Sequence, residues 1–192
     1  MTVVASNYAH KENDLYQTEP WATEALLRCF PVIGLRVWEP AAGNHLMADV
    51  LRDHGAREVQ TTDIKTYDRE HDGVFDFLHD RHVLSPRYFG AIVTNPPYGK
   101  GNRDAVHFAE LALERCFGLV ALLLTAKFDF GKTRQHLFRD CPRFMAKIAL
   151  VDRVQWFPGA TTGTEDHAWY VWGPDSEAPY TPRMFWEGRC PA

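Results

Sequence analysis

Apolar residues recur in two different patterns along the chain, and the two patterns alternate. Short runs rich in β-branched and aromatic residues, bounded by Gly, Pro or Asp, predict strands. Longer segments with apolar residues three or four positions apart predict amphipathic helices. Strands are expected at residues 35–39, 58–63, 90–94, 119–124 and 167–172, strand-like runs at 148–151, 154–157 and 183–186, and helices at 21–30, 45–54, 104–116 and 132–139.

This alternation predicts an α/β fold with a mostly parallel central sheet and helices on both faces. The unbroken apolar run 119–124 is typical of a strand that is buried on both sides. Residues 1–15 are polar without a period, and we expect a flexible N-terminal arm there. No linker divides the rest, so residues 16–192 are expected to form a single domain. The Gly- and Thr-rich segment 158–165 is expected to be a mobile loop.

Composition narrows the class of protein. The formal net charge of −4 means that any contact with a nucleic acid would need a local basic patch. The four cysteines are widely scattered, so they indicate neither a zinc site nor a disulfide framework, and the histidines show no metal-ligand spacing. No apolar stretch is long enough to span a bilayer, and the first residues do not resemble a secretory signal. We therefore expect no membrane partner, no metal and a cytoplasmic location.

The segment Asn95-Pro96-Pro97-Tyr98 directly follows the predicted strand 90–94. In open α/β sheets, ligands bind at the carboxyl ends of the strands. Asn95 offers a side-chain carbonyl, the prolines offer backbone carbonyls on a stiff turn, and Tyr98 adds a flat aromatic face. Rigid paired acceptors beside an aromatic ring suit the binding of a planar amino group. Taken alone, an Asn-Pro-Pro segment is also an ordinary turn.

Two further features of the sequence indicate a second candidate binding site. The strand 35–39 runs into Glu39-Pro40-Ala41-Ala42-Gly43, where small residues let a ligand approach the backbone and a helix start offers free N–H groups. Asp63 ends the next strand, 20 residues after Gly43, which is the offset of an acidic residue that binds ribose hydroxyls. Each feature alone is also compatible with a plain turn or a capping residue.

Taken together, these segments resemble the amino-group methyltransferases that use S-adenosylmethionine, above all the bacterial and phage adenine-specific DNA methyltransferases. The resemblance covers residues 14–173, and its five motifs occur in the order of the family. They are Tyr16-Gln17-Thr18-Glu19-Pro20, Glu39-Pro40-Ala41-Ala42-Gly43, Asp63, Asp76-Phe77-Leu78 and Asn95-Pro96-Pro97-Tyr98. The resemblance implies a Rossmann-like class I methyltransferase fold, the cofactor S-adenosylmethionine and a phage or prophage origin.

The resemblance also assigns roles to residues. It implies that the cofactor is bound by Tyr16, Thr18, Glu39, Pro40, Ala41, Gly43, Asp63, Asp76, Phe77 and Asn95. It implies that Asn95, Pro96, Pro97 and Tyr98 are catalytic. The Asn95 side-chain carbonyl and the Pro96 backbone carbonyl would bind the hydrogens of the target amine, and Tyr98 would stack on an extruded base.

The chain departs from the family at two points. Many relatives carry a second glycine two positions after the first, whereas here Gly43 is followed by Asn44 and His45, so a side chain narrows the approach to the cofactor. Larger DNA methyltransferases also carry a separate target-recognition region, which we do not expect within these 192 residues. Lys100, Arg103 and Lys127, together with Lys132 and Arg134, follow strands that flank the site, and they are equally compatible with a phosphate-binding rim and with solvated surface charge.

Several alternatives stay open at this point. The same motif occurs in enzymes that methylate RNA bases or a protein glutamine amide, and a non-catalytic binding module of the same fold is a further alternative. The tryptophans Trp156, Trp169, Trp172 and Trp186 invite a base-stacking role, but we favour the core for most of them because aromatic residues in strands are usually buried. The sequence leaves open whether the chain acts alone, as a homodimer, or with a partner.

Overall fold

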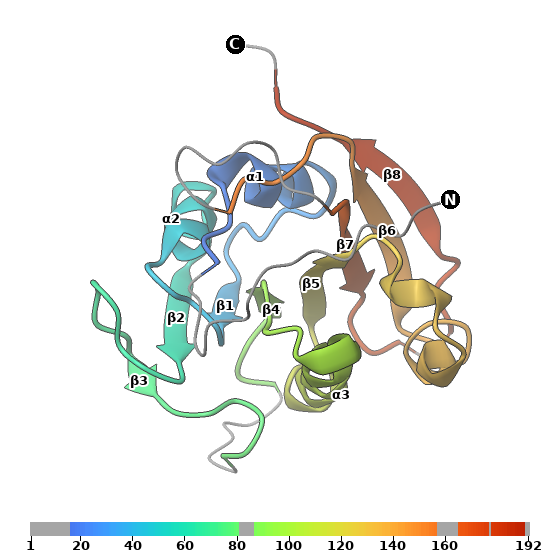
Figure 1. Cartoon of the computed structure of the whole chain (residues 1–192), viewed down its shortest axis with the longest axis horizontal. Helices are drawn as coiled ribbons and strands as arrows, with labels where there is room; N and C mark the ends of the chain where they lie inside the picture. Colours follow the sequence, from blue (N-terminus) through green and yellow to red (C-terminus); the bar gives the residue numbers. More distant parts are fainter. Residues whose placement is uncertain (1–15, 81–86, 157–164, 177, 191–192) are drawn as a thin grey trace.

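The computed structural model describes residues 16–80, 87–156, 165–176 and 178–190. These residues form one eight-stranded sheet with the strand order β3-β2-β1-β4-β5-β7-β6-β8 (Figure 1). The strands are β1 (Arg36–Glu39), β2 (Glu58–Asp63), β3 (Gly73–Val74), β4 (Ala91–Thr94), β5 (Leu119–Thr125), β6 (Phe144–Leu150), β7 (His167–Trp172) and β8 (Arg183–Glu187). The α-helices are α1 (Pro20–Cys29), α2 (Leu46–Asp53) and α3 (Arg103–Arg115), and the 3₁₀ helices are η1 (Lys100–Asn102), η2 (Phe128–Phe130) and η3 (Lys132–Leu137).

The direction of the strands determines which residues meet at one edge of the sheet. Strands β3, β2, β1, β4 and β5 pair in parallel, whereas β7 runs antiparallel to both β5 and β6. β8 pairs in parallel with β6. The carboxyl ends of β1, β2, β4 and β5 therefore lie at the same edge as the amino end of β7. The predicted α/β class with a mostly parallel sheet is confirmed.

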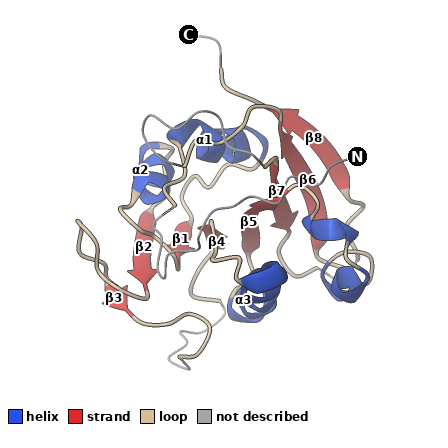
Figure 2. Ribbon diagram, in the orientation of Figure 1, coloured by secondary structure: helices blue, strands red, loops and turns tan. Residues whose placement is uncertain are grey.

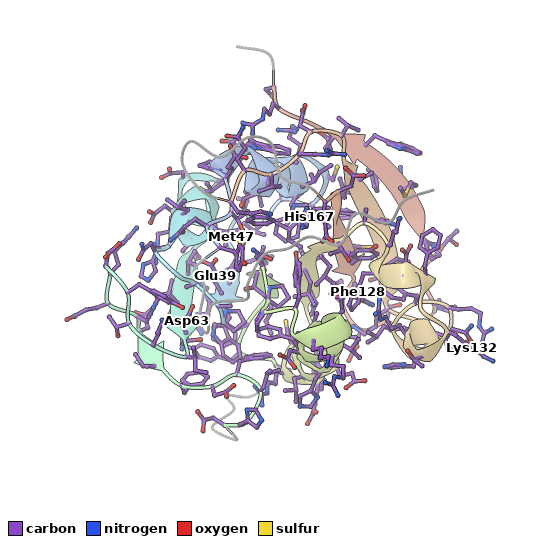
Figure 3. All side chains as sticks on the ribbon, in the orientation of Figure 1. Glu39, Met47, Asp63, Phe128, Lys132 and His167 are labelled. Carbon is purple, nitrogen blue, oxygen red and sulfur yellow. The ribbon has the colours of Figure 1, made fainter. Side chains whose placement is uncertain are left out.

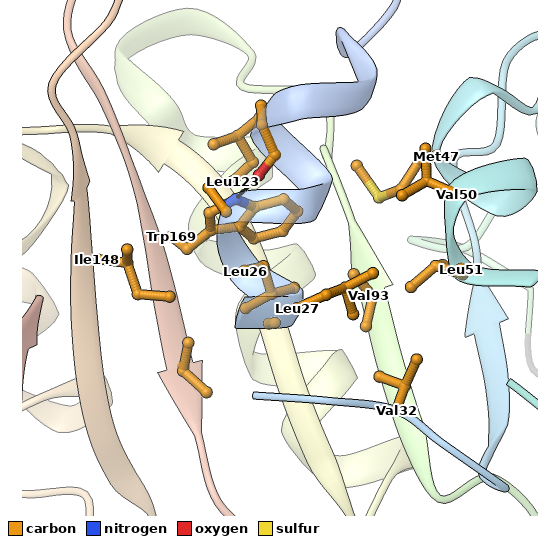
Figure 4. Close-up of a cluster of buried hydrophobic side chains, with 14 of the residues drawn as sticks. Leu26, Leu27, Val32, Met47, Val50, Leu51, Val93, Leu123, Ile148 and Trp169 are labelled. Atoms are coloured by element: carbon orange, nitrogen blue, oxygen red, sulfur yellow. Dashed lines mark hydrogen bonds between the residues drawn. The ribbon is translucent and has the colours of Figure 1, made fainter. Parts of the chain in front are cut away.

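Helices cover both faces of the sheet, as the sequence pattern predicts (Figure 2). Helices α1 and α2 pack on one face, where their apolar residues join those of β1, β5 and β7 in one buried cluster (Figure 4). Within it, the indole of Trp169 is fully buried and donates a hydrogen bond to the Ala22 carbonyl at 2.7 Å. On the other face, α3, η2 and η3 cover a second cluster that includes Trp38, Phe108 and Trp172.

The main strands and helices lie where the sequence predicts them, with four differences. The predicted helix at 132–139 is the 3₁₀ helix η3, because the Arg134 N–H bonds the carbonyl three residues earlier. β6 begins at Phe144, four residues before the predicted start. The strand expected at 154–157 does not form over its described part, since the Gln155 N–H donates to the Glu19 carboxylate at 2.7 Å and not to a neighbouring strand. The two-residue strand β3 was not predicted.

The tryptophans are only partly in the core. Trp169 and Trp172 are fully buried, as expected, whereas Trp156 is half-buried and Trp186 is 67% exposed on β8. The predicted arm at 1–15 and residues 158–164 of the predicted mobile loop lie outside the described residues. None of the helices within the described ranges combines the length and the apolar character needed to cross a membrane. The same ranges hold no group of three or more His, Cys, Asp or Glu side chains placed to bind a metal ion.

Arg143 joins three elements of the fold just before β6. Its guanidinium donates to the carbonyls of Leu113 at 3.0 Å, Gly118 at 2.6 Å and Gly173 at 2.9 Å, and its side chain is only 11% exposed. We predict that Arg143→Met lowers the free energy of unfolding by about 3 kcal/mol, because three carbonyls lose a charged donor.

Denaturant unfolding measures this effect. Arg139→Met is the matched control, because the Arg139 side chain is 70% exposed and its ion pair is with its neighbour Asp140. The control is expected to change stability by less than about 1 kcal/mol. Equal destabilisation by the two variants would contradict the role assigned to Arg143.

Candidate active site

The carboxyl edge of the sheet brings together the polar residues that the sequence singles out. Val37 and Trp38 of β1 pair with Ala91 and Ile92 of β4, so the turn after Glu39 and the segment that begins at Asn95 leave the sheet side by side. Asp63 ends β2 on the other side of β1. Figure 3 shows Glu39 and Asp63 near each other, with His167 across the centre of the molecule. The predicted cofactor motif and the predicted catalytic motif are thus neighbours in space.

The turn after β1 is held by hydrogen bonds to β2. The Ala42 N–H donates to the Thr62 carbonyl at 3.1 Å, and the Gly43 N–H donates to the Asp63 carboxylate at 2.9 Å. The other Asp63 oxygen accepts the Ile64 N–H at 2.7 Å. Gly43 adopts a positive φ of 49°, which favours glycine. Asp63 therefore orients the turn through backbone contacts, in addition to its predicted contact with ribose.

Glu39 has the least satisfied carboxyl group of the site. Its side chain is only 2% exposed, and one carboxyl oxygen, Oε2, has no hydrogen-bond partner among the described residues. Burial raises the pKa of Glu39 well above its usual range, and the charge of Asp63 adds to this while that of Arg52 opposes it. A buried carboxyl with an unused acceptor is costly unless a donor or a cation reaches it. This arrangement fits a ligand with an ammonium group.

His45 occupies a backbone position that favours glycine. It precedes α2 with φ 68° and ψ 17°, in the left-handed region that few side chains adopt without cost. Its Nε2 lies 2.8 Å from Nδ1 of His71, so one ring donates and the other accepts. Burial lowers the pKa of His45, and the nearby charge of Arg69 lowers it further. The His45 ring is thereby directed to the segment that precedes β3.

That segment is attached to the turn by several contacts. Asn44 accepts the Asp68 N–H at 3.0 Å and donates to the Asp68 carboxylate at 2.7 Å. Arg69 forms an ion pair with Asp49 of α2. Residues 68–71 therefore lie against the turn and hold the His45 ring in place.

The predicted catalytic motif is partly enclosed. Asn95 is half-buried, Pro96 is buried and Pro97 is exposed. The Tyr98 hydroxyl donates to the Leu123 carbonyl of β5 at 3.2 Å, and burial of the hydroxyl raises the Tyr98 pKa. One edge of the Tyr98 ring is therefore anchored, which stiffens the motif at the carboxyl end of β4.

A row of aromatic rings joins Tyr98 to Tyr16, and its two middle members, His167 and Trp156, are not among the predicted site residues. The Tyr98 ring lies nearly parallel to that of His167 with centroids 6.3 Å apart, and Trp156 meets His167 edge-on at 5.0 Å. Tyr16, from the predicted N-terminal cofactor motif, meets Trp156 edge-on at 6.0 Å. His167 opens an antiparallel strand, so its amino-terminal position places it at the site edge. The position of His167 at the site therefore depends on the antiparallel direction of β7, which the sequence pattern does not predict.

The remaining predicted cofactor residues have different surroundings. Phe77 is only 3% exposed and stacks on Phe108 with centroids 4.1 Å apart, while Asp76 accepts hydrogen bonds from the Leu78 N–H and the His79 ring. Thr18 is buried. Pro40 is buried and Ala41 is half-buried. Their contacts with a cofactor stay predictions.

The five basic residues predicted to bind phosphate fall into two groups in the structure. Lys100, Arg103 and Lys127 are exposed and follow β4 or β5, as the phosphate-binding hypothesis requires. Arg134 instead donates to the Phe128 carbonyl at 2.7 Å and lies over the Phe128 ring. Lys132 lies at the outer end of the molecule, far from Glu39 and Asp63 in Figure 3. Only the first three keep a place in the hypothesis.

Comparisons with solved structures agree on the architecture. The chain superposes with TM-score 0.66 and 12% identity on a type I restriction-modification methyltransferase subunit from Streptococcus thermophilus, covering 88% of this chain and 46% of that one. It superposes with TM-score 0.64 and 9% identity on a candidate class I S-adenosylmethionine-dependent methyltransferase from Listeria monocytogenes, covering 94% and 68%. The fold is that of the class I methyltransferases.

A third similar structure is a candidate RNA methyltransferase from Pyrococcus horikoshii, with TM-score 0.60, 12% identity and coverage of 80% of this chain and 81% of that one. No known protein-family profile and no curated protein sequence matches the chain. The likeness therefore extends to the fold, and this chain spans less than half of the type I subunit.

Comparison of two substitutions at His45 tests its backbone strain. His45→Ala and His45→Gly both lose the bond to His71, but only glycine adopts a positive φ without steric cost. We predict that the free energy of unfolding in urea is about 1 kcal/mol larger for the Gly variant than for the Ala variant. This difference is the relief of strain minus the cost of the larger entropy of glycine in the unfolded chain. Equal stability, or a more stable Ala variant, would show that the position carries no strain.

The buried ring of His167 predicts a specific dependence on pH. Burial lowers the His167 pKa from 6.5 to about 4, whereas in the unfolded chain the ring takes up a proton at its ordinary pKa. The folded state is therefore stabilised above pH ~6.5, and about 3 kcal/mol is lost as the pH falls toward 4.

The difference between wild type and His167→Gln isolates this contribution from those of other groups. Unfolding curves measured between pH 7.5 and 4 are expected to show a shallower decline for the variant. Parallel declines for the two proteins would refute the assignment to His167.

Proposed function

We propose that this chain is an S-adenosylmethionine-dependent methyltransferase that modifies the exocyclic amino group of adenine in DNA. The observation that carries the proposal is the position of Asn95-Pro96-Pro97-Tyr98 beside the turn from Glu39 to Gly43, on paired parallel strands. The class I methyltransferase fold and the type I restriction-modification neighbour support it.

The residues at this edge suit the proposed cofactor. Gly43 provides close access to the turn, Asp63 lies at the end of β2, and the unpaired Oε2 of buried Glu39 is an acceptor for an ammonium group. Tyr16 and Thr18 complete the proposed cofactor contacts, with Asp76 and Phe77 on the segment after β3. When bound, S-adenosylmethionine supplies a methyl group that is already activated by its sulfonium charge.

The protein's own task is then to prepare the accepting nitrogen. The lone pair of an aromatic amine is delocalised into its ring, so the amine is a weak nucleophile. In our proposal the Asn95 side-chain carbonyl and the Pro96 backbone carbonyl accept hydrogen bonds from the two N–H groups. These bonds strengthen as the nitrogen gains positive charge, so they stabilise the transition state more than the ground state.

Tyr98 has the proposed role of holding the target base. In our proposal the half-buried Tyr98 ring stacks on the base while its hydroxyl stays bound to the Leu123 carbonyl. Stacking contributes ~1–3 kcal/mol per base, which offsets part of the cost of extruding a base from a duplex. Exposed Lys100, Arg103 and Lys127 would bind the phosphate backbone next to it.

The test is the nucleoside content of a methylation-deficient bacterial host that expresses either the chain or its Asn95→Ala variant. We expect methyladenine in the DNA only with the intact chain, and a decrease of about 100-fold or more in the variant, because an amine-binding acceptor is lost. Mass spectrometry of separated DNA and RNA measures the outcome.

Cofactor binding by calorimetry provides the matched comparison. Asn95 is only one of the proposed cofactor contacts, so Asn95→Ala should weaken S-adenosylmethionine binding far less than it lowers methylation, whereas Asp63→Ala should weaken binding strongly. Methylation of RNA alone would transfer the proposal to an RNA substrate, as the Pyrococcus neighbour would suggest. If the wild type does not bind the cofactor, a non-catalytic binding module is favoured. If it binds the cofactor but methylates neither DNA nor RNA, a protein amide is favoured as the substrate.

A further inference from the structure

The last strand of the sheet has an outer edge that no other described strand covers. β8 pairs with β6 on one side only and ends the strand order (Figure 1). An open edge presents unpaired N–H and C=O groups, which is a ready template for another strand. β8 also exposes two large apolar side chains, Met184 at 43% and Trp186 at 67%. Among the described residues, both the outer edge of β8 and one of its faces are therefore open.

The hydrogen bonds of β8 show which of its groups point outward. The Val151 N–H donates to the Glu187 carbonyl at 2.9 Å, on the β6 side of the strand. Backbone groups alternate in direction along a strand, so those of Arg183, Phe185 and Glu187 point toward β6. The N–H and C=O groups of Met184 and Trp186 point to the open edge.

The sequence of β8 is complementary to itself in the antiparallel direction. If two copies meet with Phe185 at a two-fold axis, Met184 lies opposite Trp186 of the other copy, and Arg183 lies opposite Glu187. Met184 and Trp186 then exchange both of their outward backbone hydrogen bonds, which gives the ladder that antiparallel pairing requires. Parallel pairing would instead place Arg183 against Arg183 and Glu187 against Glu187.

The side-chain pairs of this arrangement are also favourable. A methionine sulfur beside an indole is an attractive contact, and opposite charges directly across two strands stabilise a sheet. On the other face, Phe185 rests edge-on against Phe30 at 5.7 Å and Glu187 pairs with Arg28 at 2.7 Å, so β8 is held firmly in the sheet. The exposed Phe130 lies next to Lys147, which pairs with Met184, and adds apolar surface beside the edge.

We propose that β8 is a dimerisation edge, at which two copies of this chain pair antiparallel about Phe185 and join their sheets into one. β8 runs in the same direction as β5, because β7 reverses the chain once between β5 and β6. The two-fold axis then directs the carboxyl edges of the two sheets to opposite sides. Each copy keeps a complete site of its own, so this inference does not depend on the proposed methyltransferase function.

Sedimentation velocity of the full chain between about 1 and 100 µM tests the proposal. The expected species is a dimer with twice the chain mass of 22.0 kDa. Trp186→Lys should raise the dimer dissociation constant at least about tenfold, because it places a charge in the apolar pair at both ends of the interface. Ile33→Lys is the matched control, since Ile33 is 73% exposed and lies outside β8, and it should leave the constant unchanged.

A charge exchange tests the pairing of Arg183 with Glu187, and because Glu187→Arg also breaks the ion pair with Arg28, the unfolding transition of each variant is measured beside its oligomeric state. Arg183→Glu and Glu187→Arg should each yield monomers, because like charges meet at both ends of the paired strands. An equimolar mixture of the two variants should restore the dimer, since every pair is then again of opposite charge. A monomer at all concentrations, a dimer that resists these substitutions, or a mixture that stays monomeric would each overturn the proposal, whereas cofactor binding per chain should not change in any variant.

Discussion

Parallel pairing of β1 with β4 determines the distance between the Glu39–Gly43 turn and Asn95, and with it the geometry of the whole candidate site. The two strands are short: Val37 and Trp38 of β1 pair with Ala91 and Ile92 of β4, and the Gly90 N–H donates to the Arg36 carbonyl at 2.9 Å. Both strands are buried, and helices on each face exclude water from them. A hydrogen-bonded ladder in a dry layer has little freedom to slide, because every slip would leave buried N–H and C=O groups unpaired.

The end of β1 and the turn that follows it contain the groups that are costly to the fold. Glu39 is a buried carboxyl with an unpaired oxygen, and His45 adopts a left-handed backbone conformation. Such features persist where the surrounding structure holds them, here the Asp63 bond to Gly43 and the His71 contact with His45. Their concentration at one edge of the sheet, away from the well-packed layers, is the distribution expected of a binding site that is organised before its ligand arrives.

The other half of the sheet, from β5 to β8, contains antiparallel strands. β7 lies antiparallel between β5 and β6, which brings His167 to the site edge and leaves β8 as the outermost strand. The aromatic row from Tyr16 to Tyr98 depends on the reversed direction of β7, whereas β8 has an open edge because it ends the strand order. The chain thus combines a ligand-facing edge made of polar and aromatic residues with a lateral edge made of Met184 and Trp186 between two opposite charges.

Local features of the sequence were sufficient for most elements and for the residues of the site. Apolar periodicity located α1, α3, β2, β4, β5 and β7, since side-chain period depends only on nearby positions. The turn residues Gly43 and Asn95 could be recognised because short motifs at strand ends have characteristic residue types. The tertiary structure alone decided what depends on long-range pairing: the antiparallel placement of β7, the failure of residues 154–156 to join the sheet, the contact of His45 with His71, and the exposure of Trp186. Local periodicity shows whether a segment is a strand or a helix. The neighbour that the segment packs against is determined by the burial of the whole chain, so these four features could not be predicted from the sequence.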